Sequence, residues 1–217
     1  MSDIDLEQMI TAVREYFPSL TLKEQQIAFQ AYQLLAKGAP VTRQQLASRL
    51  QLSLSPVSET LDRWWGVQFD AADRIIGFWG LTLQPTTHRL HINGRVLYTW
   101  CAWDTLFIPL ILRATAQIES QCPVSQEPIH LTVTPSQVTT VEPDSTTLSF
   151  LTPDAGAVKD NIVSNFCHYV FFMSSRDAGT QWIEAHPGTF MMSIEDAFVL
   201  GQRITAIQYA DVIDRGE

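Results

Sequence analysis

Two residues with chemically useful side chains lie three positions apart in the segment Trp100-Cys101-Ala102-Trp103-Asp104-Thr105. If this segment opens a helix, Cys101 and Asp104 stand at i and i+3 and share one face. The positive end of the helix dipole would then favour the thiolate form of Cys101. The spacing predicts a soft nucleophile beside a proton carrier. A buried apolar thiol and a dipole-compensating Asp are the alternative interpretation.

The other cysteines are far away in the sequence, at Cys122 and Cys167. Three widely spaced cysteines indicate neither a disulfide framework nor a CxxC-type zinc motif. Cys167 lies in an aromatic segment, and a strand over residues 165–173 would place Cys167, Tyr169 and Phe171 on one face. Taken alone, a cysteine in such a strand is a core residue.

Histidines do not supply a recognisable ligand or catalytic pattern. The five are His88, His91, His130, His168 and His186, and none forms an i, i+4 or H-x-H pair. Most are therefore interpreted as surface or hydrogen-bonded structural residues. His88 is set apart because it lies in the segment Pro85-Thr86-Thr87-His88.

Composition narrows the class of protein. The 217 residues are 46% hydrophobic and 17% charged, which is typical of a globular chain with a sizeable core. The net charge of −9, from 23 acidic and 14 basic residues, argues against nucleic-acid and anionic-membrane partners. The apolar run Leu106–Leu112 is too short to span a bilayer, and the acidic N-terminus does not resemble a signal peptide. A cytoplasmic location is expected.

The first 80 residues predict a winged helix-turn-helix-like unit. Helices are expected over residues 5–17, from Thr21 to near Gly38, over 42–50, and from a Ser55 cap to about Trp65, followed by a hairpin over 67–80. Nine acidic and seven basic residues give this unit a net charge of 7 − 9 = −2. DNA binding needs a basic face, so a structural packing role is favoured.

Residues 81–217 predict a larger domain of short strands and helices. Asn93-Gly94 joins a hairpin over 88–92 and 95–99. A helix over 101–116, bent or restarted at Pro109, should follow. Further strands are expected at 116–119, 129–134, 137–141, 147–151 and 165–173, with helices at 177–186 and 193–212. The fold class is α+β, with mostly antiparallel sheets packed with helices and a domain boundary after residue 80.

Several segments, in order along the chain, resemble the alkylmercury lyase family. They are Gly80-Leu81-Thr82-Leu83, Pro85-Thr86-Thr87-His88-Arg89, Gly94 to Leu106, Cys122, Leu131-Thr132-Val133-Thr134-Pro135-Ser136, Phe166-Cys167 and Ala197-Phe198-Val199-Leu200-Gly201-Gln202. The Trp-Cys-x-x-Asp block followed by a distant Phe-Cys is the specific part of this resemblance. The N-terminal winged-helix-like unit also fits the family.

The resemblance implies an organomercurial lyase that breaks the carbon–mercury bond by protonolysis. Cys101 and Cys167 would be the mercury-binding thiols, Asp104 the proton carrier and a further metal-site residue, and Cys122 a structural residue. Many family members carry a second cysteine where this chain has His168, which puts secondary metal handling in doubt. No bound cofactor is implied. Hg(II) would be the bound product, free cellular thiols would remove it, and a mercuric reductase is a candidate recipient.

The implied chemistry suits these residue types. Soft thiolates select soft metals, and general acid catalysis contributes about 10²–10⁴ in rate. A dry pocket would raise the pKa of Asp104 and help it carry a proton. The aromatic residues expected to line it are Trp100, Trp103, Phe107, Tyr169 and Phe171, for which ordinary core packing is the alternative.

Three other functions remain open at this point. A metal-responsive winged-helix regulator would use the thiols for sensing. A cysteine hydrolase would use Cys101 as nucleophile with a histidine base and Asp104 as orienting group. A thiol protein that binds metal without turnover would keep the three residues and lack catalysis.

Overall fold

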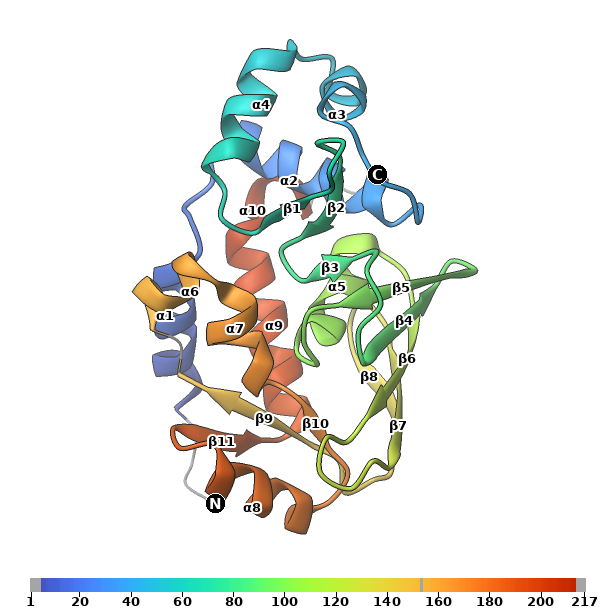
Figure 1. Ribbon diagram of the computed structural model, residues 1–217, viewed down its shortest axis with the longest axis vertical. Helices are drawn as coiled ribbons and strands as arrows, with labels where there is room; N and C mark the ends of the chain where they lie inside the picture. Colours follow the sequence, from blue (N-terminus) through green and yellow to red (C-terminus); the bar gives the residue numbers. More distant parts are fainter. Residues whose placement is uncertain (1–4, 153, 214–217) are drawn as a thin grey trace.

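The computed structural model describes residues 5–152 and 154–213 and shows a mixed α/β architecture. Within these residues the strands form a large antiparallel sheet in the order β1-β2-β3-β5-β4-β6-β7-β8 and a small sheet in the order β10-β9-β11. Figure 1 shows most of the large sheet to the right of the long helix α9 and the small sheet at the lower end of that helix. The expectation of antiparallel sheets packed with helices is confirmed.

Four helices begin the chain, and side-chain caps start three of them. They are α1 (Leu6–Tyr16), α2 (Leu22–Leu35), α3 (Arg43–Leu50) and α4 (Leu54–Arg63). Asp5 caps α1, while Thr21 with Glu24 forms the predicted capping box of α2. The predicted Ser55 cap of α4 is wrong. The helix starts at Leu54, so Pro56 still lies in the first turn, where its missing N–H costs nothing.

The large sheet contains strands from both sides of residue 80. Its strands are β1 (Val67–Phe69), β2 (Ile75–Phe78), β3 (Leu81–Thr82), β4 (His88–Ile92), β5 (Arg95–Thr99), β6 (Ala116–Gln121), β7 (Pro128–Val133) and β8 (Val138–Glu142). Gly77 pairs with Thr82 and Leu81 pairs with Thr99, so the hairpin β1–β2 continues into the main sheet through β3.

The small sheet and the remaining helices complete the chain. They are α5 (Asp104–Leu112), β9 (Thr147–Leu151), α6 (Ala155–Asp160), α7 (Ile162–Asn165), the 3₁₀ turn η1 (Cys167–Tyr169), β10 (Phe172–Met173), α8 (Arg176–Ala185), β11 (Thr189–Met192), α9 (Ile194–Gln208) and α10 (Ala210–Ile213). Helix α9 packs against α1, α5 and β9, and α2 packs against α5 and α10. The N-terminal helices therefore share a core with the C-terminal ones.

Two predicted elements near the cysteines differ from the structure. The expected helix over 101–116 is shorter, because Cys101 precedes α5, which begins at Asp104 and continues through Pro109. The expected strand over 165–173 is wrong except at its end, where β10 lies. In place of the strand lie the last residue of α7 and the 3₁₀ turn η1, and two asparagine side chains stabilise α7. The side chain of Asn161 accepts from the N–H of Ser164, and that of Asn165 donates to the Ala157 carbonyl.

Within the described residues, no helix has the length and apolar character needed to cross a membrane. Residues 1–4, on which part of the signal-peptide argument rests, lie outside those residues.

An aromatic cluster joins the N-terminal helices to the sheet. The ring of Trp79 lies 4.8 Å from that of Trp64 and 4.9 Å from that of Phe78. Tyr32 of α2 meets Phe78 edge-on at 5.0 Å. Gly66 makes room for this cluster, because a Cβ at that position would lie 1.7 Å from Cδ1 of Trp79.

We expect Gly66→Ala to lower the free energy of unfolding by about 3 kcal/mol, because the indole of Trp79 must leave its packed position. Urea denaturation followed by tryptophan fluorescence measures this loss. Gly94→Ala is the control, since an added Cβ there meets nothing within 4 Å and only the left-handed backbone is strained. Equal losses in the two variants would contradict the packing argument.

Candidate active site

Three side chains from separate elements meet in the interior. Cys101 lies in the turn between β5 and α5, Asp104 is the first residue of α5, and Cys167 is the first residue of η1. Their ligand atoms all lie within 4.8 Å of one another, and among the described residues this is the group of Cys, His, Asp and Glu suited to a metal ion. The exposed fractions are 0% for Cys101, 7% for Asp104 and 3% for Cys167. The site is therefore closed to bulk water.

Backbone hydrogen bonds hold the two cysteine segments together. The N–H of Ala102 donates to the Val170 carbonyl at 3.1 Å, which joins the turn after β5 to the end of η1. Thr99 donates from Oγ1 to the Cys101 carbonyl at 2.8 Å, and Thr105 donates to the Ala102 carbonyl at 2.7 Å. These buried hydroxyls fix the turn and so the direction of the Cys101 side chain.

Asp104 is an acid kept in an apolar interior. Desolvation raises its pKa from 3.8 to about 7, because burial disfavours the charged carboxylate. Hydrogen bonds limit the rise: the N–H of Cys101 donates to Oδ2 at 2.9 Å, and the Cys101 thiol and the N–H of Trp100 also act to lower the pKa. The carboxyl group can therefore gain and lose a proton near neutral pH.

Both site thiols resist ionisation. Burial raises the pKa of Cys101 well above its ordinary value, and the neighbouring Cys167 and Asp104 raise it further. Burial also raises the pKa of Cys167. The expectation that a helix dipole favours a Cys101 thiolate is wrong, because this residue precedes the helix and is fully desolvated.

Trp103, which lies between Cys101 and Asp104 in the sequence, belongs to a cluster of aromatic rings. Trp103 packs against Phe107, Phe150 and Phe166 with ring centroids 5.1, 5.3 and 6.2 Å apart, and its indole N–H donates to the Ala197 carbonyl. The other aromatic residues expected to line a pocket lie in different surroundings. Trp100 donates to the Gln68 side chain, Tyr169 lies beside His186, and Phe171 lies beside His88 and Trp182.

Cys122 does not join this group. It is buried at the end of β6, and its thiol is hydrogen-bonded by Ser125 and by backbone groups of Val124, Ser125 and Ser174. Desolvation raises its pKa, but these hydrogen bonds outweigh that effect and lower it overall. The thiol thus ties the β6–β7 turn to the segment after β10.

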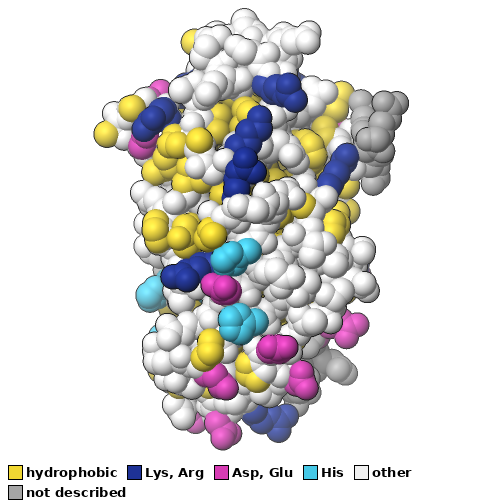
Figure 2. Space-filling view, turned by 90° about the vertical axis from the view of Figure 1, so that its right-hand side faces the viewer, with side chains coloured by type: hydrophobic (Ala, Val, Ile, Leu, Met, Phe, Trp, Pro, Cys, Tyr) yellow, Lys and Arg dark blue, Asp and Glu magenta, His cyan; other side chains and the backbone are white. Residues whose placement is uncertain are grey.

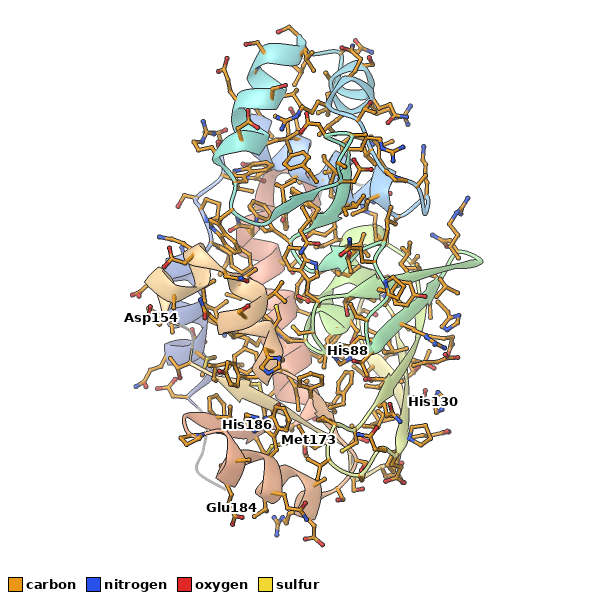
Figure 3. All side chains as sticks on the ribbon, in the orientation of Figure 1. His88, His130, Asp154, Met173, Glu184 and His186 are labelled. Carbon is orange, nitrogen blue, oxygen red and sulfur yellow. The ribbon has the colours of Figure 1, made fainter. Side chains whose placement is uncertain are left out.

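No histidine side chain belongs to the group formed by Cys101, Asp104 and Cys167 among the described residues. His88 is buried, its Nδ1 lies 2.8 Å from Oγ of Ser120, and desolvation lowers its pKa to about 3. Figure 3 shows His88, His130 and His186 in separate parts of the molecule. His168 is exposed although it adjoins Cys167. No histidine contributes to the pKa shift of Cys101 or Cys167.

Gly80 touches the site although sequence reasoning assigned it no role. A Cβ at Gly80 would lie 2.5 Å from Oδ1 and 2.6 Å from Cγ of Asp104. Glycine between two short strands was the available signal, but the sequence does not reveal which side chain approaches it.

A pH-dependent stability follows from the buried carboxyl group. Its pKa is about 7 in the folded state and 3.8 ordinarily, so the folded state binds more protons than the unfolded state between these values. Stability therefore falls as the pH rises through this window. Above pH 7, we expect Asp104→Asn to be more stable than the wild type by roughly 4 kcal/mol, with the difference vanishing below about pH 4. Urea denaturation across this range measures it, and a pH-independent difference would contradict the argument.

Comparison with known proteins identifies the family of this chain. Residues 81–206 match the family model described as "MerB: Alkylmercury lyase". An alkylmercury lyase of Streptomyces lividans is 42% identical over 173 residues, which cover 80% of this chain and 79% of the relative. Alkylmercury lyases of Pseudomonas putida and Bacillus cereus are 41% and 38% identical, covering 78% and 82% of this chain and 78% and 80% of the relatives.

A solved structure shares the fold over nearly the whole chain. It is the "Crystal structure of the mercury-bound form of MerB2", with a TM-score of 0.75 and 26% identity, covering 94% of this chain and 98% of that one. The family model and the relatives together decide the family. The chain belongs to the alkylmercury lyase family and is an enzyme that acts on organomercurial compounds.

Proposed function

We propose that Cys101 and Cys167 bind the mercury atom of the substrate and that Asp104 delivers the proton that releases the hydrocarbon. The observation that carries this assignment is the buried Cys–Asp–Cys group, whose ligand atoms lie within 4.8 Å of one another. Two sulfurs suit a soft cation and one carboxyl group suits proton transfer. That the structural relative was solved in a mercury-bound form supports the same assignment.

The reaction proceeds in three balanced steps. A first site thiol displaces the thiolate carried by the incoming organomercurial, and its proton leaves with the released small thiol. The second thiol then bonds to mercury and transfers its proton to the Asp104 carboxylate. Finally the Asp104 carboxyl group protonates the carbon as the carbon–mercury bond breaks. The products are a hydrocarbon, Hg(II) bound to two sulfurs, and a carboxylate again. The order in which the two thiols act stays open.

Burial explains why this group is suited to the task. Neutral thiols lose their protons when a mercury atom bonds to sulfur, since a metal-bound thiol is deprotonated. With a pKa of about 7, Asp104 accepts a proton in one step and donates it in the next without a large free-energy penalty in either. Exclusion of water keeps that proton for the substrate carbon.

The same proposal covers the cofactor requirement, the partners that remove the product and the cellular compartment. We expect no resident cofactor, because the thiols and the carboxyl group supply all the chemistry. Low-molecular-weight thiols release the bound Hg(II), and a mercuric reductase is a candidate recipient. A reducing cytoplasm suits this cycle, since Cys101 and Cys167 must stay as free thiols.

The N-terminal unit is assigned a structural role. We keep the winged-helix-like description for residues 1–80 and the lyase domain for residues 81–217. Several basic side chains of this unit pair with its own carboxylates: Arg43 with Asp62 and Asp73, and Arg63 with Glu24. Figure 2 shows Lys and Arg side chains mostly in the upper half of the face that carries strands β4 to β7, and Asp and Glu side chains mostly in its lower half. Residues 1–80 as a whole have a net charge of −2, whereas a nucleic-acid partner needs an excess of cations.

Hydrocarbon release tests the residue roles. The purified protein is given phenylmercury with excess free thiol, and benzene is measured by headspace gas chromatography. We expect Cys101→Ser and Cys167→Ser each to lower the rate by at least about 10³-fold, since neither serine binds mercury as a thiolate does. Cys122→Ser is the matched control, because this buried thiol lies outside the group; it should keep turnover and lose only stability.

The other interpretations predict different results. A cysteine hydrolase would tolerate Cys167→Ser. A regulator or a non-catalytic thiol protein would bind phenylmercury and release no benzene above the thiol-only blank. Either result, from folded and reduced protein, would overturn the proposed roles.

A further inference from the structure

The backbone at Gly80 packs directly against the Asp104 carboxyl group. A Cβ placed on Gly80 would lie 2.5 Å from Oδ1, 2.6 Å from Cγ and 3.1 Å from Cβ of Asp104. The first two distances are shorter than any ordinary contact, so only a residue without a side chain allows the present position of the carboxyl group. The backbone at Gly80 also has φ +98°, which disfavours every other residue.

Three hydrogen bonds hold the backbone around Gly80 in place. The Gly80 carbonyl accepts from the N–H of Trp100, the residue before Cys101, at 2.8 Å. The N–H of Trp79 donates to the Gly66 carbonyl at 2.9 Å. The Trp79 carbonyl, in the same peptide unit as the Gly80 N–H, accepts from the hydroxyl of Tyr32 at 2.7 Å. The backbone on both sides of the Trp79–Gly80 peptide bond is therefore held by hydrogen bonds.

Tyr32 belongs to the N-terminal unit. Its side chain is 1% exposed and lies in α2, between Phe78 and Tyr209. Trp79 itself has φ +30°, a conformation that a bulky residue adopts only when its surroundings enforce it. The enforcing contacts are the packed ring of Trp64 at 4.8 Å and the Tyr32 hydroxyl.

We propose that Gly80 and Tyr32 are positioning residues of this lyase: Tyr32 clamps the Trp79–Gly80 peptide, and the side-chain-free Gly80 sets where the Asp104 carboxyl group lies relative to the two thiols. This inference rests on the proposed role of Asp104 as proton carrier. It gives the N-terminal unit a part in catalysis, because α2 reaches the proton carrier through one peptide group.

The direct test is Gly80→Ala measured against Gly188→Ala. Both glycines have a left-handed backbone, φ +98° and +92°, but a Cβ at Gly188 meets nothing within 4 Å. The two substitutions therefore share the backbone strain and differ in the collision with Asp104. We expect kcat of Gly80→Ala to fall by about 100-fold, the loss typical of a misplacement near 1 Å. The KM of this variant should equal that of the wild type. Its Hg²⁺ binding curve, followed by thiolate–mercury absorbance, should also equal that of the wild type. Gly188→Ala should keep kcat.

A second pair of variants applies if Gly80→Ala does not fold. Tyr32→Phe and Tyr209→Phe each remove a hydroxyl from the same buried pair of rings, whose centroids lie 6.3 Å apart. Only Tyr32→Phe frees the Trp79 carbonyl. We expect its kcat to fall roughly tenfold with KM unchanged, while Tyr209→Phe keeps kcat.

The outcomes separate this inference from the function on which it rests. If Asp104→Ala keeps full turnover, the proposed role of Asp104 fails, and the inference fails with it. If Asp104→Ala is inactive but Gly80→Ala or Tyr32→Phe keeps the wild-type kcat, the clamp alone is wrong. If Gly80→Ala and Gly188→Ala lose kcat equally, the backbone strain that both share explains the loss without a collision with Asp104. That result would also overturn the inference.

Discussion

Desolvation of a carboxyl group and two thiols is the constraint on which the rest of this structure depends. An ionised group inside a protein costs several kcal/mol unless it is paired. Burial therefore favours the neutral forms of these three groups near neutral pH. For Asp104 the balance between burial and the N–H of Cys101 gives a pKa of about 7. The same burial raises the pKa of the Cys101 and Cys167 thiols, which keeps them protonated near neutral pH. A stabilising ion pair at Asp104 would lower its pKa and weaken its ability to donate.

The architecture serves this constraint by closing the site from several sides. The large sheet supplies the turn that carries Cys101, η1 supplies Cys167, and the N-terminal unit restrains the peptide beside Asp104. Helix α9, which packs against α1 and α5, supplies the carbonyl that holds the indole of Trp103. These three side chains are consequently only 0–7% exposed.

Sequence reasoning reached the fold class, most strands and the residues that meet, and it failed where burial or local capping decides. Alternating patterns and the Asn93-Gly94 turn predict β4 to β9 well, because strands of a half-buried sheet repeat every two residues. The segment around Cys167 is predicted as a strand from its aromatic residues, but it forms the 3₁₀ turn η1 directly after α7, whose first turn is capped by the Asn161 side chain. The ionisation of Cys101 was misjudged for a similar reason, since three-dimensional burial cannot be read from i, i+3 spacing. Gly80 shows the same limit, because a close approach between distant residues leaves no local pattern.

Mass spectrometry of the intact protein after one equivalent of phenylmercury tests the central claim most directly. If the thiols hold mercury and Asp104 delivers the proton, the wild type must gain the mass of mercury and lose two hydrogens. Asp104→Asn must instead keep the phenyl group, and its mass must increase by that of phenylmercury with one hydrogen lost, because the carbon–mercury bond stays intact. The same mercury-only mass in Asp104→Asn, formed at the wild-type rate, would contradict the account.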